Sequence, residues 1–150
     1  MTDIALSWDA ALFGADIAVA GGDLVTDDGL RTAVILSLFS DARARDDDAL
    51  PDAGSDRRGW WGDVAASPAD DRTGSRLWLL ARSKNLPAVL ANVRDYVREA
   101  LAWLIEDGVA ASIDIVAETP RRDALALGVT INRPGGAAGR RFDFVWEATL

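Results

Sequence analysis

The sequence contains no histidine and no cysteine, so it lacks the side chains that most often serve as bases, nucleophiles and metal ligands near neutral pH. A Ser-His-Asp or Cys-His catalytic arrangement cannot be built from the remaining residues. A zinc site made of imidazole and thiolate is excluded on the same ground. Any catalytic or metal centre would have to be made of carboxylates or of backbone groups.

Three segments could supply such a centre, and each has a simpler interpretation. The acidic run at 46–48 lacks the glycine and the terminal glutamate of a calcium loop, so a solvated acidic loop is the better interpretation. Glu118 and Asp63 could act as the paired carboxylates of a glycosidase, yet no pattern indicates a cleft that would raise the pKa of either. Residues 135–139 are rich in glycine, but a strand follows them where a phosphate loop needs a helix. We therefore predict no catalytic residue, no metal site and no cofactor.

The charge of the chain bears on its partners. It carries 16 basic and 24 acidic residues, for a formal net charge of −8, and so acidic a protein is a poor ligand for nucleic acid or an anionic membrane. Residues 1–20 lack a basic segment followed by an apolar run, so no secretory signal is expected. No stretch approaches the roughly 18 consecutive apolar residues of a membrane span. We expect neither nucleic acid nor membrane as a partner.

Hydrophobic periodicity predicts the elements that would position a binding site. Apolar residues alternate with polar or small ones at 4–8 and again at 17–19, and a glycine pair at 21–22 is followed by Leu24 and Val25, which predicts an N-terminal β-hairpin. Asp27 or Asp28 is a suitable N-cap for a helix. The apolar stripe that follows predicts this helix over residues 30–42.

Two further helices are predicted in the middle of the chain. Residues 75–83 form a short one. Residues 86–106 form the strongest amphipathic pattern, which Gly108 would end. The apolar face of this long helix is expected to consist of Leu86, Leu90, Val93, Val97, Leu101 and Leu104.

The last third of the chain predicts an antiparallel meander, because residues 113–118, 125–131 and 142–147 have apolar residues at every second position. Strands with one apolar and one mixed face form a sheet that helices cover on one side. The predicted fold is therefore α+β, with the N-terminal hairpin and the helices packed on one face of an antiparallel C-terminal sheet. We expect residues 1–150 to form a single domain, and no internal repeat is evident.

A long connection at about 43–75 contains two adjacent tryptophans between glycines. Connections of this length in a compact domain usually have a function. Two interpretations are open: both rings cover an edge of the core, or they anchor a partner, because Trp and Arg are enriched at binding hot spots. The second interpretation predicts partner-binding residues Arg57, Arg58, Trp60, Trp61 and Asp63.

A second candidate contact lies between two predicted strands, at Glu118, Pro120 and Arg121. The simple interpretation is a turn that ends a strand, since proline cannot donate to a sheet. The alternative is an ion pair between Glu118 and Arg121 that shapes a docking edge. A sheet edge could also accept a strand from a partner.

Several stretches together resemble the Mu-like phage baseplate protein family, whose members are small wedge components of contractile tails. The likeness lies in residues 22–30 leading into 32–39, in Arg-Gly-Trp-Trp-Gly-Asp at 58–63, and in Gly-Ser-Arg-Leu-Trp at 74–78. The long helix and the terminal β meander complete it, so it spans nearly the whole chain.

The resemblance implies a structural subunit that joins the baseplate to the first sheath ring. Its partners would be other baseplate wedge, sheath and hub proteins in a symmetric hetero-oligomeric assembly, located in the virion tail baseplate of a phage or tailocin and assembled in the host cytoplasm. The wider group carries a Glu-Pro-Arg motif at a partner contact, and Glu118, Pro120 and Arg121 approximate it with Thr119 inserted.

Two other functions remain open from the residues alone. A lysozyme-type peptidoglycan hydrolase would use Glu118 as its acid, although the sequence predicts no enzyme. A regulatory binding module in the cytosol would bind one host protein and be missing from particles.

Overall fold

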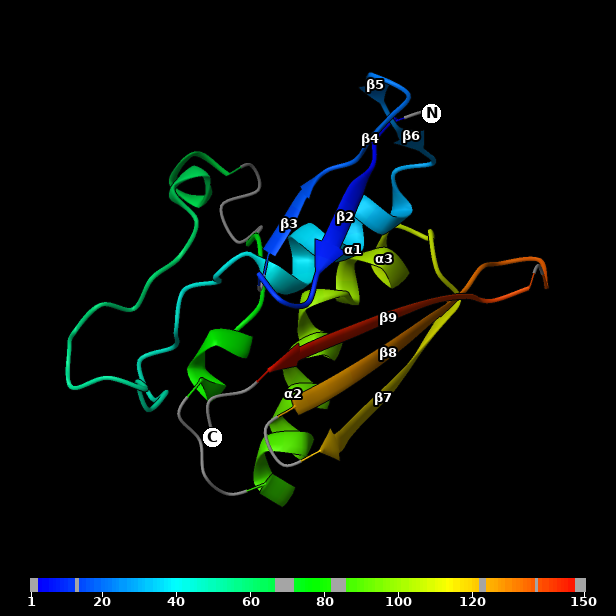
Figure 1. The fold of residues 1–150 in the computed structure, drawn as a ribbon. Helices are drawn as coiled ribbons and strands as arrows, with labels where there is room; N and C mark the ends of the chain where they lie inside the picture. The colour runs from blue at the N-terminus through cyan, green and yellow to red at the C-terminus, as the bar shows by residue number, and fades with distance from the viewer. Residues whose placement is uncertain are drawn as a thin grey trace.

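The last part of the chain in the computed structural model, residues 112–147, forms a three-stranded antiparallel sheet in the order β7-β8-β9 (Figure 1). Its strands are β7 (Ser112–Arg121), β8 (Ala124–Asn132) and β9 (Arg140–Glu147), so the predicted meander is confirmed. The structure describes residues 3–12, 14–66, 72–81, 86–121, 124–136 and 138–147. The apolar residues at every second position of β8 are buried as predicted, namely Leu125, Leu127, Val129 and Ile131.

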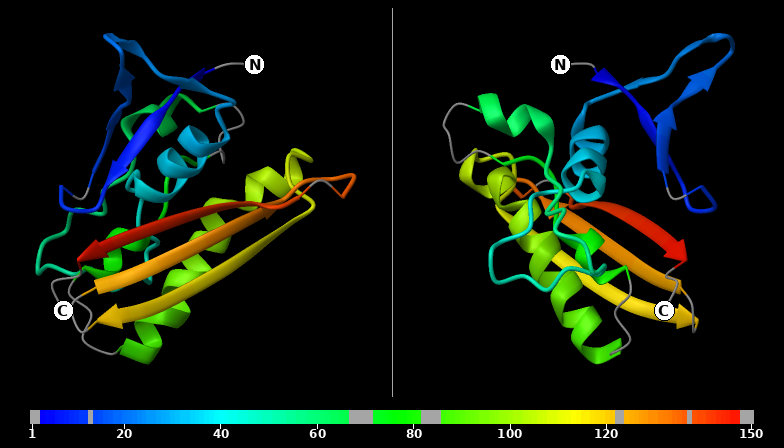
Figure 2. Two further views of the ribbon diagram at one scale, coloured as in Figure 1. Left: turned by 45° about the vertical axis from the view of Figure 1, so that its right-hand side comes forward. Right: turned by 90° about the vertical axis from the view of Figure 1, so that its left-hand side faces the viewer.

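A long helix covers one face of this sheet (Figure 2). The prediction of one continuous helix over 86–106 is wrong, because the helix is interrupted at Leu101. The two parts are α2 (Leu86–Ala100) and α3 (Ala102–Glu106). Leu101 has φ −105° and ψ 4° and is fully buried, so the helix breaks where its side chain enters the core. Gly108, at φ 70°, follows α3 as expected. Among the described side chains of α2, Val89, Val93 and Val97 are buried. The predicted face residue Leu90 is only partly buried, and the side chain of Leu86 lies outside the described ones.

The first helix, α1 (Leu30–Phe39), is shorter than the predicted 30–42. Its N-cap is Gly29 at φ 78°, and neither predicted aspartate takes that position. Asp27 accepts a hydrogen bond from the Gly29 N–H at 2.6 Å. The helix ends at Phe39 because Ser40 is extended and forms backbone hydrogen bonds with the end of the long connection.

The N-terminal region contains three short antiparallel ribbons where one hairpin was expected. They pair β1 (Asp3–Ile4) with β6 (Thr26–Asp27), β2 (Leu6–Asp9) with β3 (Gly14–Ile17), and β4 (Val19–Ala20) with β5 (Asp23–Leu24). The glycine pair at 21–22 makes the β4–β5 turn with φ 62° and 84°, as predicted. The β1–β6 and β4–β5 ribbons lie farther from the C-terminal sheet, whereas β2–β3 runs beside α1 toward β9 (Figures 1 and 2).

The core lies between α1, α2 and the sheet, and aromatic rings extend it to the N-terminal ribbons. Trp8 stacks on Phe39 with ring centroids 3.9 Å apart, and both rings contact Phe144 edge-on. These contacts couple β2 to the sheet at the Phe144 position of β9. Among the described helices, none is long and apolar enough to cross a membrane.

Candidate protein-binding loop and strand end

The long connection starts and ends at the same place, beside the C-terminus of α1. Its two ends form a parallel bridge between Asp41 and Ser75, with Ser75 N–H donating to Ser40 at 2.9 Å. The Ser75 hydroxyl donates to the Leu38 carbonyl at 2.5 Å. Gly74 has φ 100°, and a Cβ there would lie 2.4 Å from the Ser40 carbonyl oxygen, so only glycine fits. The loop therefore has a closed neck.

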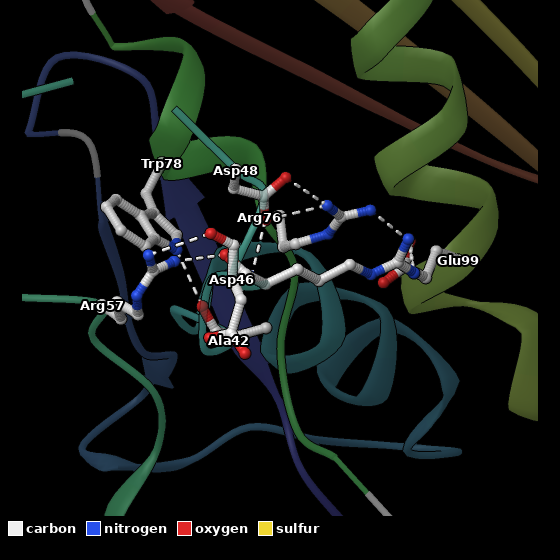
Figure 3. Close-up of polar contacts among 8 residues, drawn as sticks. Ala42, Asp46, Asp48, Arg57, Arg76, Trp78 and Glu99 are labelled. Atoms are coloured by element: carbon white, nitrogen blue, oxygen red, sulfur yellow. Dashed lines mark hydrogen bonds and ion pairs between the residues drawn. The ribbon is translucent and has the colours of Figure 1, made fainter. Parts of the chain in front are cut away.

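Arg76 holds the first part of the loop against α2 (Figure 3). Its guanidinium donates to both carboxylate oxygens of Asp48 at 2.7 and 2.9 Å and to Glu99 of α2 at 2.7 Å. It also lies over the Tyr96 ring, 4.5 Å from the centroid. Arg45 reaches Glu99 at 3.0 Å. These bonds join residues separated by more than 20 positions in sequence, so they position the loop on the helix.

The charges at this network reinforce one another. Burial alone would raise the pKa of Asp48, but hydrogen bonds from the Arg45 N–H and the Arg76 guanidinium outweigh it and lower the pKa below its usual range. Burial alone would lower the pKa of Arg76, but Glu99 and Asp48 raise it. The side chains of Arg76 and Asp48 are only 9% and 12% exposed, so water screens their attraction weakly.

Of the predicted binding residues, Arg57 contacts the loop itself and Arg58 contacts residues on either side of it. The Arg57 guanidinium donates to the carbonyls of Arg45 and Asp46, the latter at 3.1 Å. Arg58 forms an ion pair with Asp41 at 2.8 Å, and it lies over the Trp78 ring at 4.4 Å. The two arginines thus shape the framework that precedes the tryptophans.

The tryptophan pair lies at the far end of the loop, where the 3-10 helix η1 (Trp61–Ala65) begins. Trp60 folds over Gly62, where an added Cβ would come within 2.1 Å of the indole ring. Trp61 is 82% exposed and Val64 is 92% exposed. The interpretation in which both rings cover the core therefore does not hold. Val64 was not among the predicted binding residues. The spacing could have indicated it, because residues three positions apart lie on the same side of a helical turn.

Asp63 differs from its neighbours because it is buried, with 7% exposed. Its Oδ1 accepts a hydrogen bond from the Thr73 N–H at 3.1 Å. This bond connects η1 to the returning part of the loop. Asp63 therefore contributes to the internal framework of the loop, and little of its side chain is available to a partner.

The second candidate contact lies elsewhere, at the end of β7 (Figures 1 and 2). Glu118 pairs with Ala126 of β8, and the register shifts before Arg121 pairs with Ala124. The Glu118 and Pro120 side chains are exposed. The side chain of Arg121, the predicted ion-pair partner of Glu118, lies outside the described ones. The end of β7, which carries Glu118, lies apart from η1, which carries Asp63 (Figures 1 and 2), so these two residues do not form a carboxylate pair.

The described residues include no group of three acidic side chains arranged to hold a metal ion. The acidic run at 46–48 makes contacts within the protein. Asp48 binds Arg76, and the Asp46 carbonyl accepts from Arg57. The run belongs to the loop framework.

Comparisons with known proteins identify the family of the chain. The family model described as phage protein GP46 matches residues 30–138. The chain is 46% identical over 137 residues to the baseplate protein gp46 of Escherichia phage Mu, covering 91% of each chain. It is 37% identical over 141 residues to the Mu-like prophage FluMu protein gp46 of Haemophilus influenzae (strain ATCC 51907 / DSM 11121 / KW20 / Rd), covering 94% of each. The chain belongs to the phage GP46 family.

Proposed function

We propose that this chain is a structural, non-catalytic component of a contractile phage-tail or tailocin baseplate, folded as a single wedge-type domain. Its similarity to the Mu baseplate protein extends over 91% of both chains, so the shared part includes the fold, the tryptophan loop and the strand end. We further propose that it joins the baseplate to sheath or hub proteins.

The observation that carries this proposal is an exposed apolar knob, made of Trp61 and Val64, on a loop that is otherwise tightly held. A tryptophan that is 82% exposed is costly to leave in water, and burial of such rings dominates the energetics of many interfaces. The Arg76 network and the closed neck order the loop before binding. A pre-ordered loop loses less conformational entropy on association.

The strand end is proposed as a second contact. Glu118 and Pro120 are exposed at the end of an edge strand, where a partner could pair charges with Glu118 and Arg121. A partner strand could also add to β9, the other edge of the sheet. A deletion of residues 141–147 would not test this addition, because it would remove Phe142 and Phe144 from the core. Glu118→Ala combined with Pro120→Ala tests the contact with less damage, since both side chains are exposed.

The knob is tested with Trp61→Ala and Val64→Ser in tail particles produced by an induced prophage that carries the variant. Neither change should alter the free energy of unfolding by more than about 0.5 kcal/mol, because both residues are exposed. We expect each to lower the ratio of this chain to sheath protein at least about tenfold, measured by mass spectrometry. Leu36→Ser, at a 49% exposed position of α1, is the control. Normal incorporation of both knob variants would contradict the proposal.

The non-catalytic part of the proposal has a separate test. The purified chain should not clear cell walls, and Glu118→Gln should leave that result unchanged. Clearing that disappears in the variant would establish the chain as a hydrolase.

A further inference from the structure

A small hollow lies between residues 50–58 of the long connection and the 3-10 helix η2 (Leu77–Leu80). Its volume is about 80 Å³, which is well below the roughly 300–1,000 Å³ of a small-molecule site. The hollow still has room for several water-sized groups, so it can take one long side chain. Its lining includes Leu50, Pro51, Asp52, Asp56, Arg58 and Trp78.

One residue of this lining has an unfavourable backbone conformation. Arg58 has φ 50°, and it is the single non-glycine residue with positive φ in the described part of the chain. Surrounding contacts must impose such a conformation, and residues of this kind gather at binding sites. The Arg58 N–H donates to Asp56 Oδ1 at 2.8 Å. Its guanidinium pairs with Asp41 at 2.8 Å and lies over the Trp78 ring at 4.4 Å, so this wall is fixed before a partner binds.

The charge on the described lining is negative. Asp52 and Asp56 contribute two carboxylates, and both residues are exposed to solvent. The guanidinium of Arg58 is the opposing charge, but its ion pair with Asp41 already offsets it. The hollow therefore attracts a positive group and repels an acidic one.

The apolar part of the lining suits the stem of a basic side chain. Leu50, Pro51 and Trp78 are half-buried and line the hollow. Lysine and arginine pack their methylene groups on apolar surface while the charged end remains in a polar environment. An aliphatic side chain would match the apolar wall alone, and it would leave the carboxylates without a counter-charge.

We propose that the hollow is a socket for an arginine or lysine side chain of a neighbouring tail protein. The socket rests on the proposed function, because it adds a second contact to the loop that carries the Trp61 knob. The two contacts differ in chemistry. The knob requires apolar groups on the partner, and the socket requires a basic residue within reach of the same loop.

The socket is tested first in the purified chain, with Nα-acetyl-arginine amide and Nα-acetyl-lysine amide as probes. The Trp78 indole N–H, which donates to the Ala42 carbonyl at 2.8 Å, reports on the hollow by NMR. We expect a saturable shift that Nα-acetyl-glutamate amide does not cause. Asp52→Asn with Asp56→Asn should weaken binding of the basic probes about fivefold.

The matched control is Asp46→Asn with Asp47→Asn, which removes the same charge from exposed positions of the loop outside the described lining. It should leave the affinity of the basic probes unchanged. The proposal would be overturned by the lack of a saturable shift, by an equal shift with the acidic probe, or by an equal loss of affinity in the control.

A second test uses tail particles from an induced prophage. Asp52→Asn with Asp56→Asn should dissociate from particles at a several-fold lower salt concentration than the parent chain, because the partner's basic side chain loses its counter-charge. A parental salt dependence would overturn the socket even if the probes bind. Trp61→Ala separates the two proposals. If it is incorporated normally while the asparagine variant is released by salt, the knob fails and the socket stands, and the reverse result removes the socket alone.

Discussion

Removal of the Arg76 guanidinium is expected to destabilise the protein far more than removal of a surface arginine. Arg76 is 8% exposed and binds Asp48 and Glu99 at once. Loss of one partner from a buried ion pair costs about 3–5 kcal/mol. Glu99 is 44% exposed and keeps its bond to Arg45, so we lower the expected cost of Arg76→Ala to about 2–4 kcal/mol.

The assay is urea and thermal unfolding at pH 7, followed by tryptophan fluorescence. For a domain of this size, the expected cost lowers the Tm by about 5–15 °C. Hydrogen exchange should also show lost protection in the loop around Asp48, since Arg76 connects this part of the loop to α2. The control is Arg98→Ala. Its ion pair with Asp95 has the same 2.7 Å distance but is 65% and 68% exposed, so it should cost at most about 0.5 kcal/mol.

The pH dependence gives a second check. The folded-state pKa of Asp48 is lowered, so its ion pair contributes stability above the unfolded-state pKa near 3.8 and loses it as the pH falls through the folded value. The stability difference between the parent chain and Arg76→Ala should therefore shrink below about pH 4. A cost below about 0.5 kcal/mol at pH 7, or a difference that grows in acid, would refute this reasoning.

Three further changes test other parts of the fold. Gly74→Ala should cost about 2–4 kcal/mol by calorimetry, because its φ of 100° and the approach to Ser40 both oppose a Cβ; a neutral result would show that the neck relaxes. Trp8→Ala should cost about 2 kcal/mol and Trp8→Phe about half of that, because only the latter keeps a ring on Phe39; equal costs would argue against stacking. Hydrogen bonding to Arg140 chiefly lowers the pKa of Asp28, so Asp28→Asn should flatten the stability curve below about pH 4 in acid titration; an unchanged curve would contradict the pairing.

The sheet and the long helix were predictable because each buries one face along many residues. The alternation in β8 and the spacing of Val93 and Val97 in α2 are repeated often enough to identify strand and helix. The interruption at Leu101 was not predictable, since the apolar spacing continues through it. Likewise, α1 ends early because of a bridge to Ser75, a contact that local periodicity cannot reveal.

The pairing of the N-terminal ribbons could not be predicted from the sequence for a different reason. Alternation between residues 4 and 25 indicated strands correctly, but the paired segments are two to four residues long, so no periodicity shows which segments pair. Asp-Ile-Ala occurs at residues 3–5 and again at 16–18, and the Ala18 N–H donates to the Ala5 carbonyl at 2.9 Å, so this recurrence was a usable signal. In the loop, the tryptophans were found from composition, whereas the role of Arg76 depends on Glu99 of another element.

Because the loop is closed at Ser40 and Gly74, the stability of the core depends little on how many residues the loop contains. Both ends of the segment are fixed side by side by backbone hydrogen bonds, so residues added between them change only the entropy of an already closed ring. That cost grows with the logarithm of length, at about 0.6 kcal/mol for each doubling. The part of the loop that follows Asp48 can therefore change in length while the folded body is kept, provided that Arg45 and Asp48 retain their bonds to Glu99 and Arg76.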